Sequence, residues 1–163
     1  MKRIGYYMLS LALLSLAGPA YAQNTADKGF EKLKSLAGEW DGIKSDGQKV
    51  ALSYKVISGG SAVVETLMPV NEPDMVTVYH MDGDRLMMTH YCSAGNQPRM
   101  VAEQAGRGED RIDFELLDLT NLTDSSPGHM KHLTLKFAAD GSLAQVWTFN
   151  RDGKSMPATF NFT

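Results

Sequence analysis

The side chains that could bind or transform a small molecule gather in the middle of the chain. His90 and Cys92 are two positions apart, so a strand would turn both toward the same face. Gln97 and Arg99 follow after a turn, and an arginine that faces an apolar interior can hold a carboxylate through two parallel hydrogen bonds. Glu65 lies in an apolar run and could be the internal counter-charge of that arginine. These residues predict a mostly apolar site with one polar end, which would bind a small amphipathic molecule.

Each of these residues also has a plainer interpretation, which the sequence leaves open. His90 could be a core histidine satisfied by one or two hydrogen bonds. Arg99 follows a turn and could lie in solvent, and Glu65 could do the same. An unpaired cysteine such as Cys92, the only one in the chain, is most often a small buried hydrophobic residue.

An enzyme is the main alternative to a binding protein. His90 would then act as a general base, and Arg99 would stabilise a developing negative charge. However, the sequence contains no serine in a nucleophile elbow, no glycine-rich phosphate loop and no carboxylate pair at helical spacing. His129 and His132 are three positions apart, which suits metal ligation only outside a strand. The sequence therefore assigns no catalytic residue, metal or cofactor, and a structural or interaction module without a ligand is the third hypothesis.

Short alternating strands must position these residues. Four Asp-Gly pairs separate the alternating segments, which is the strongest local signal for β-hairpins; they are Asp46-Gly47, Asp82-Gly83, Asp140-Gly141 and Asp152-Gly153. Apolar residues at helical spacing predict one helix over 25–36. The alternation then predicts ten strands, near 38–44, 48–57, 61–68, 75–81, 85–92, 98–104, 110–118, 131–138, 142–149 and 155–162.

These elements predict an all-β fold, an antiparallel up-and-down β-barrel of about ten strands with one short N-terminal helix that caps it. Closure removes the exposed edges that an open sheet of this size would present. A β-sandwich is the alternative, but its crossovers need longer connections than this chain offers. A barrel wider than about eight strands has room for more than its own side chains, so we expect a cavity inside.

The turn at Asp82-Gly83 decides which residue of the preceding strand faces the interior. A two-residue loop places Tyr79 beside Leu86 on the inner face. A three-residue loop with a bulge at Gly83 turns His80 inward instead. The sequence leaves both registers open, and Tyr79 joins the candidate ligand-binding residues.

The first 22 residues read as a secretory signal peptide. Lys2 and Arg3 precede an apolar segment, and Ala20-Tyr21-Ala22 supplies the small residues of a cleavage site. We expect cleavage after Ala22, a periplasmic or extracellular location and no stable membrane insertion afterwards. The remaining residues, 23–163, are long enough for one domain. With 14 basic and 19 acidic side chains they carry a net charge of −5, which argues against nucleic acid as a partner.

The sequence also resembles a known group of barrel proteins. Gly38-x-Trp40 after a short helix, followed by a meander of about ten strands, is similar to the calycins, which include lipocalins, fatty-acid-binding proteins and haem-binding nitrobindins. The block from His90 to Arg99 resembles secreted bacterial proteins of unknown function. The resemblance implies a barrel that holds a ligand. Nitrobindins ligate haem through a histidine late in the chain, and the segment 155–163 contains none, which argues against haem and leaves the cofactor open.

Overall fold

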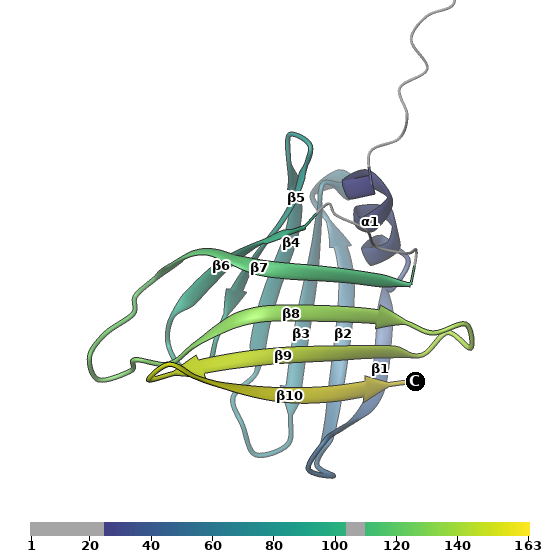
Figure 1. The fold of residues 1–163 in the computed structure, drawn as a ribbon. Helices are drawn as coiled ribbons and strands as arrows, with labels where there is room; N and C mark the ends of the chain where they lie inside the picture. The colour runs from purple at the N-terminus through teal and green to yellow at the C-terminus, as the bar shows by residue number, and fades with distance from the viewer. Residues whose placement is uncertain (1–24, 104–109) are drawn as a thin grey trace, which may run out of the picture.

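Ten antiparallel strands close into one barrel. The structure, a computed structural model, describes residues 25–103 and 110–163. Each strand pairs with its neighbours in the sequence, and β10 returns to β1, so the strand order is β1-β10-β9-β8-β7-β6-β5-β4-β3-β2. In Figure 1, β7 to β10 cross in front of the steeper strands β1 to β5. The predicted all-β, up-and-down barrel is confirmed, and the β-sandwich alternative is wrong.

The elements follow the predicted segments closely, with strand ends that differ by at most two residues. They are α1 (Thr25–Lys34), β1 (Gly38–Lys44), β2 (Lys49–Ile57), the 3-10 turn η1 (Ser58–Gly60), β3 (Ala62–Pro69), β4 (Met75–Asp82), β5 (Arg85–Tyr91), β6 (Gln97–Ala102), β7 (Arg111–Thr120), β8 (His129–Phe137), β9 (Leu143–Arg151) and β10 (Lys154–Phe162).

The four Asp-Gly pairs all lie at hairpin turns, as predicted. The turn between β9 and β10 shows why this dipeptide is suited to the place. Arg151 pairs with Lys154, so Asp152 and Gly153 form a two-residue loop. Their φ angles are 52° and 74°, and a type I′ turn requires a positive φ at both of its central residues.

The turn between β4 and β5 settles which residue faces the interior. Asp82 pairs with Arg85, so the two loop residues are Gly83 and Asp84. Tyr79 consequently lies opposite Met88, two residues further along β5 than Leu86, the partner expected from the predicted two-residue loop. Tyr79 is fully buried, whereas His80 is only half-buried and contacts the carbonyl oxygen of Met81. Tyr79 is therefore the inward residue.

Helix α1 covers one end of the barrel, and the predicted cap is confirmed. Its apolar side chains Phe30 and Leu33 are buried with the barrel core. Gly29 lies so close to β5 that a Cβ atom there would be 3.2 Å from Leu86, at the start of that strand. The opposite end, which we call the distal end, is formed where β5 and β7 finish and where β4, β6 and β8 begin (Figure 1).

The barrel closes through a short seam between β1 and β10. Three residue pairs join these strands, and one of them is Gly42 with Phe162. A Cβ atom on Gly42 would lie 2.4 Å from the Phe162 ring and 2.7 Å from the carbonyl oxygen of Asn161. Phe162 is fully buried, so its ring cannot move aside without disturbing the core.

The substitution Gly42→Ala is therefore expected to destabilise the protein by overpacking the seam. We expect the free energy of unfolding to fall by about 1–3 kcal/mol, as measured by chemical denaturation. Ser53→Ala, at a half-buried position on the outer face of β2, is the control and should change it by less than about 0.5 kcal/mol. Equal stability of the two variants would show that the Phe162 ring does not limit this position.

The predicted signal peptide, residues 1–22, lies outside the described residues, so its cleavage stays a prediction. Within 25–103 and 110–163, no helix has both the length and the apolar character needed to cross a membrane.

Candidate functional site

A buried polar cluster occupies the interior of the barrel. We call it the inner polar cluster; its members are Tyr54, Glu65, Thr77, Tyr79, His90, Gln145 and Trp147, each at most 3% exposed. Buried polar groups are normally retained only when hydrogen bonds satisfy them. A cluster of this size inside an otherwise apolar core therefore marks the place where the interior could do chemistry.

Four of these residues form one row across four neighbouring strands. Tyr54 on β2 is paired with Glu65 on β3, Glu65 with Thr77 on β4, and Thr77 with His90 on β5. Directly paired residues in a sheet point to the same face, so all four side chains enter the interior at one level. Gln145 reaches Glu65 from β9.

Glu65 is the centre of the hydrogen-bond network. Its Oε2 accepts hydrogen bonds from Tyr54 Oη at 2.6 Å, Tyr79 Oη at 2.8 Å and Gln145 Nε2 at 2.9 Å. Its Oε1 accepts one from Thr77 Oγ1 at 3.3 Å. Burial raises the pKa of Glu65, and the four donors act against that rise. Burial, followed by the charge of Glu65, raises the pKa values of both tyrosines, which therefore stay protonated donors.

His90 ends the row and differs from the other members in one respect. Its Nδ1 lies 2.9 Å from Thr77 Oγ1, but its Nε2 is buried with no hydrogen-bond partner. The imidazole ring packs on Trp147, with ring centroids 4.5 Å apart and an angle of 39° between the planes. Burial lowers the pKa of His90 to about 4, so the ring is neutral at physiological pH. His90 thus presents one unused nitrogen in a dry, partly aromatic setting.

Two further unpartnered atoms lie at the distal end of the barrel. Among the described residues, the buried side-chain atoms without a partner are His90 Nε2, Asn96 Oδ1 and His129 Nδ1. His90 is one residue from the end of β5, Asn96 lies in the β5–β6 turn and His129 begins β8. Asn96 Nδ2 donates to the carbonyl oxygen of Gly128, which ties the β5–β6 turn to the segment before β8. The unused hydrogen-bonding capacity is therefore concentrated at one end.

The structure brings together three of the six predicted site residues, Glu65, Tyr79 and His90. Arg99 does not join them, and the expectation that it faces the interior is wrong. Its neighbours Pro98 and Met100 are buried, so alternation along β6 turns Arg99 outward, where it forms an exposed ion pair with Asp118 on β7. Glu65 accordingly has tyrosines and an amide as partners instead of a guanidinium.

Gln97 and Cys92 lie at the distal end but outside the inner polar cluster. Gln97 is half-buried; its amide donates to the carbonyl oxygen of Gly95, and its Oε1 accepts a hydrogen bond from Thr120. Cys92 is half-buried against the core, and burial raises the pKa of its thiol. A raised pKa leaves the thiol protonated, which disfavours a nucleophilic role.

Sequence reasoning missed four members of the cluster, namely Tyr54, Thr77, Gln145 and Trp147. Trp147 donates from Nε1 to Gln145 Oε1 at 3.0 Å. The available signal was a polar residue at an inward position of a strand. The alternation of buried and less buried residues in β2 and β4 places Tyr54 and Thr77 at such positions. Gln145 could not be found this way, since its partner Glu65 is 80 residues away.

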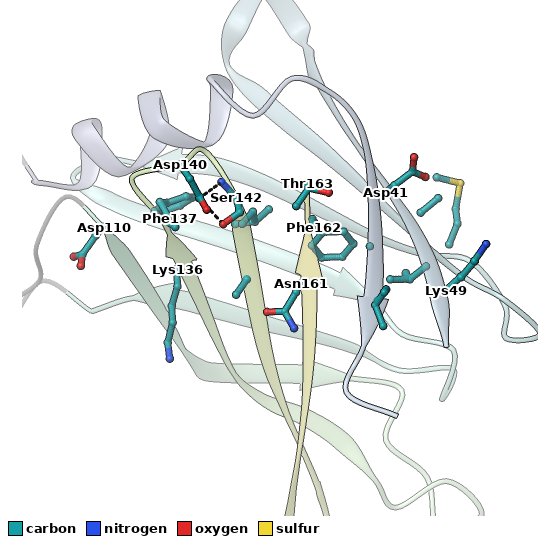
Figure 2. Close-up of a pocket in the computed structure, with 18 of the residues that line it drawn as sticks. Asp41, Lys49, Asp110, Lys136, Phe137, Asp140, Ser142, Asn161, Phe162 and Thr163 are labelled. Carbon is teal, nitrogen blue, oxygen red and sulfur yellow. Dashed lines mark hydrogen bonds between the residues drawn. The ribbon is translucent and has the colours of Figure 1, made fainter. Parts of the chain in front are cut away.

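Large side chains fill much of the interior where a cavity was expected. Phe114, Phe162 and Met88 are among the largest fully buried residues. In the described part of the chain, a groove of about 1360 Å³ is lined largely by outward residues of β1, β2 and β8 to β10. Figure 2 shows Asp41 and Lys49 on one side of Asn161, and Lys136 on the other.

The outer groove is a weaker candidate than the inner polar cluster. Its lining contains three acidic and three basic side chains, so it favours neither anions nor cations. Asp140 is already satisfied by the backbone N–H and the hydroxyl of Ser142 (Figure 2). None of the predicted site residues lines it.

No metal centre is found in the part of the chain that the structure describes, where no group of three or more His, Cys, Asp or Glu side chains is arranged to hold an ion. The spacing of His129 and His132 suggested a pair of metal ligands, but both ring nitrogens of His132 already have hydrogen-bond partners. His132 Nδ1 lies 2.8 Å from Glu115 Oε1, and its Nε2 lies 2.9 Å from Thr134 Oγ1.

The sequence matches no protein-family model and no curated protein. The function therefore has to be inferred from the geometry of the site.

Proposed function

We propose that the protein binds a small, partly apolar molecule inside the barrel, with His90 Nε2 as the polar contact. The observation that carries this proposal is the unpartnered Nε2 in a cluster whose other polar side chains have hydrogen bonds. Leaving a buried polar group unpaired costs about 1–3 kcal/mol, and a ligand atom on Nε2 would remove that cost. Trp147 beside the imidazole offers an apolar face to the rest of the molecule.

The distal end is the proposed entrance. His90 is one residue from the end of β5, whereas α1 covers the opposite end. Asn96 Oδ1 and His129 Nδ1 lie at this end with unused hydrogen-bonding capacity. In this proposal the protein is a secreted or periplasmic member of the calycin-like barrels, and neither a nucleic acid nor a membrane is its partner.

Catalysis is the second candidate, and one observation favours it. A hydrogen-bonded chain runs from the carboxylate of Glu65 through the hydroxyl of Thr77 to the imidazole of His90. Such a chain can orient a general base. Among the described residues, no nucleophilic side chain is hydrogen-bonded to His90 Nε2. Binding is therefore proposed first, and His90 acting on a bound substrate second.

Native mass spectrometry of the protein purified from its own secretory compartment tests the proposal. We expect extra mass in the native spectrum that is lost on denaturation, and we expect the variant His90→Phe to lose it. His90→Phe keeps a planar ring against Trp147 but removes both nitrogens. Arg99→Ala, on the outer surface, is the matched control and should retain the ligand. Equal occupancy in wild type and His90→Phe, or a bare protein that neither the purified lipid fraction nor aromatic compounds stabilise against heat, would refute the proposal.

A further inference from the structure

We infer that Glu65, acting through Thr77, fixes His90 Nε2 as a hydrogen-bond acceptor, so the site selects un-ionised ligands that present a hydroxyl or N–H donor. This inference rests on the proposed binding function and specifies its ligand class. Glu65 and Thr77 are positioning residues in it, because only His90 would touch the ligand.

The direction of each hydrogen bond follows from counting protons. Three donors converge on Glu65 Oε2, and hydrogen bonds donated to a carboxylate favour its ionised form against the effect of burial. An ionised Glu65 has no proton, so Thr77 donates its single hydroxyl proton to Glu65 Oε1, 3.3 Å away. Thr77 Oγ1 can then only accept from His90, 2.9 Å away, which makes Nδ1 the protonated nitrogen. A neutral imidazole carries one N–H, so Nε2 keeps a free lone pair. The lowered pKa of His90 agrees with a neutral ring.

The surroundings of Nε2 argue against an anionic ligand. The facing residue Trp147 gives its N–H to Gln145, and the inner polar cluster contains no lysine or arginine. The nearest charge along the row is the carboxylate of Glu65, which would repel a second anion. An inward Arg99 would have suited a ligand with a carboxylate. The structure instead favours a neutral ligand that has a hydrogen-bond donor and an apolar or aromatic body.

The variant Glu65→Gln should reverse the donor and acceptor roles along the row. Three donors, from Tyr54, Tyr79 and Gln145, converge on Glu65 Oε2, so the amide oxygen of the variant would stay there and its NH2 would face Thr77. Thr77 would accept from that NH2 and donate its own proton to His90 Nδ1. His90 would then carry its proton on Nε2 and would offer a donor in place of an acceptor.

Nitrogen NMR at pH 8, on protein labelled with 15N-histidine, tests the direction of the hydrogen bonds in the row without any ligand. The signals that are absent from the spectrum of His90→Phe are assigned to His90. We expect Nε2 to be unprotonated in the wild type and protonated in Glu65→Gln. Thr77→Ser should behave as the wild type, and Thr77→Val should make the tautomer independent of residue 65. A protonated Nε2 in the wild type, or the same tautomer in both forms, would overturn the inference.

Binding of isosteric probes tests the ligand class. Indole and pyrrole carry an N–H donor, whereas benzofuran and furan have the same shapes without it. We expect the wild type to bind the better N–H probe about tenfold more tightly than its oxygen isostere, and Glu65→Gln to lose that preference. Equal affinities in the wild type would overturn the ligand class. The NMR experiment could show the expected tautomers while none of the four probes binds saturably. That result would contradict the proposed function and the ligand class, but it would leave the hydrogen-bonded row in place.

Discussion

Replacing Glu65 by alanine is expected to lower the free energy of unfolding by about 3–5 kcal/mol, the largest stability loss of any single substitution considered for this protein. The reason is the number of donors that converge on this one carboxylate. Tyr54, Tyr79 and Thr77 would lose their acceptor at residue 65 in the dry interior. Gln145 Nε2 would keep only its hydrogen bond to Tyr54 Oη. Chemical denaturation at pH 7, monitored by tryptophan fluorescence, measures the loss of unfolding free energy.

Two further variants separate the lost hydrogen bonds from the lost volume. Glu65→Gln keeps an acceptor for three of the donors and should cost clearly less than Glu65→Ala. A triple variant, Glu65→Leu with Tyr54→Phe and Tyr79→Phe, removes the central acceptor together with two of its donors, and should recover part of the stability lost in Glu65→Ala. If Glu65→Ala lost less than about 1 kcal/mol, the cluster would not be held together by this carboxylate.

The barrel could be predicted because its signals are local. Asp152-Gly153 shows this, since the dipeptide forms a two-residue turn between the alternating strands that flank it. The inward position of His90 followed in the same way from alternation with Leu86 and Met88 on β5. Local pattern is enough when the answer depends on a few consecutive residues.

The errors arose where a turn or a distant strand decides the answer. The β5–β6 turn has no two-residue signature, so alternation from His90 could not be carried across it to Arg99. The contact between Gln145 and Glu65 exists only because β9 and β3 lie on opposite sides of a closed barrel. Its geometry depends on every register between them, which no local pattern contains.

His90 gives the second large effect, a loss of stability in acid. Its pKa is lowered from 6.5 to about 4 in the folded protein, because burial penalises the charged ring. Between these two values the unfolded chain binds a proton at His90 that the folded protein does not. The free energy of unfolding should therefore fall by about 3 kcal/mol as the pH drops from 6.5 to 4, and this contribution should be constant above pH 6.5.

The groups that face His90 determine how this effect is isolated. They are Thr77 on β4, Trp147 on β9 and, through Thr77, the carboxylate of Glu65. The pKa of Glu65 is raised, so its own contribution to stability has the opposite sign and is lost as the pH rises through that raised value. Comparing wild type with His90→Phe at each pH largely cancels this contribution and those of the exposed carboxylates. The difference in unfolding free energy between the two proteins should change by about 3 kcal/mol between pH 6.5 and pH 4, to the disadvantage of the wild type. A constant difference would mean that His90 takes up its proton at the same pH in the folded and the unfolded protein, so that the buried ring would be charged in acid.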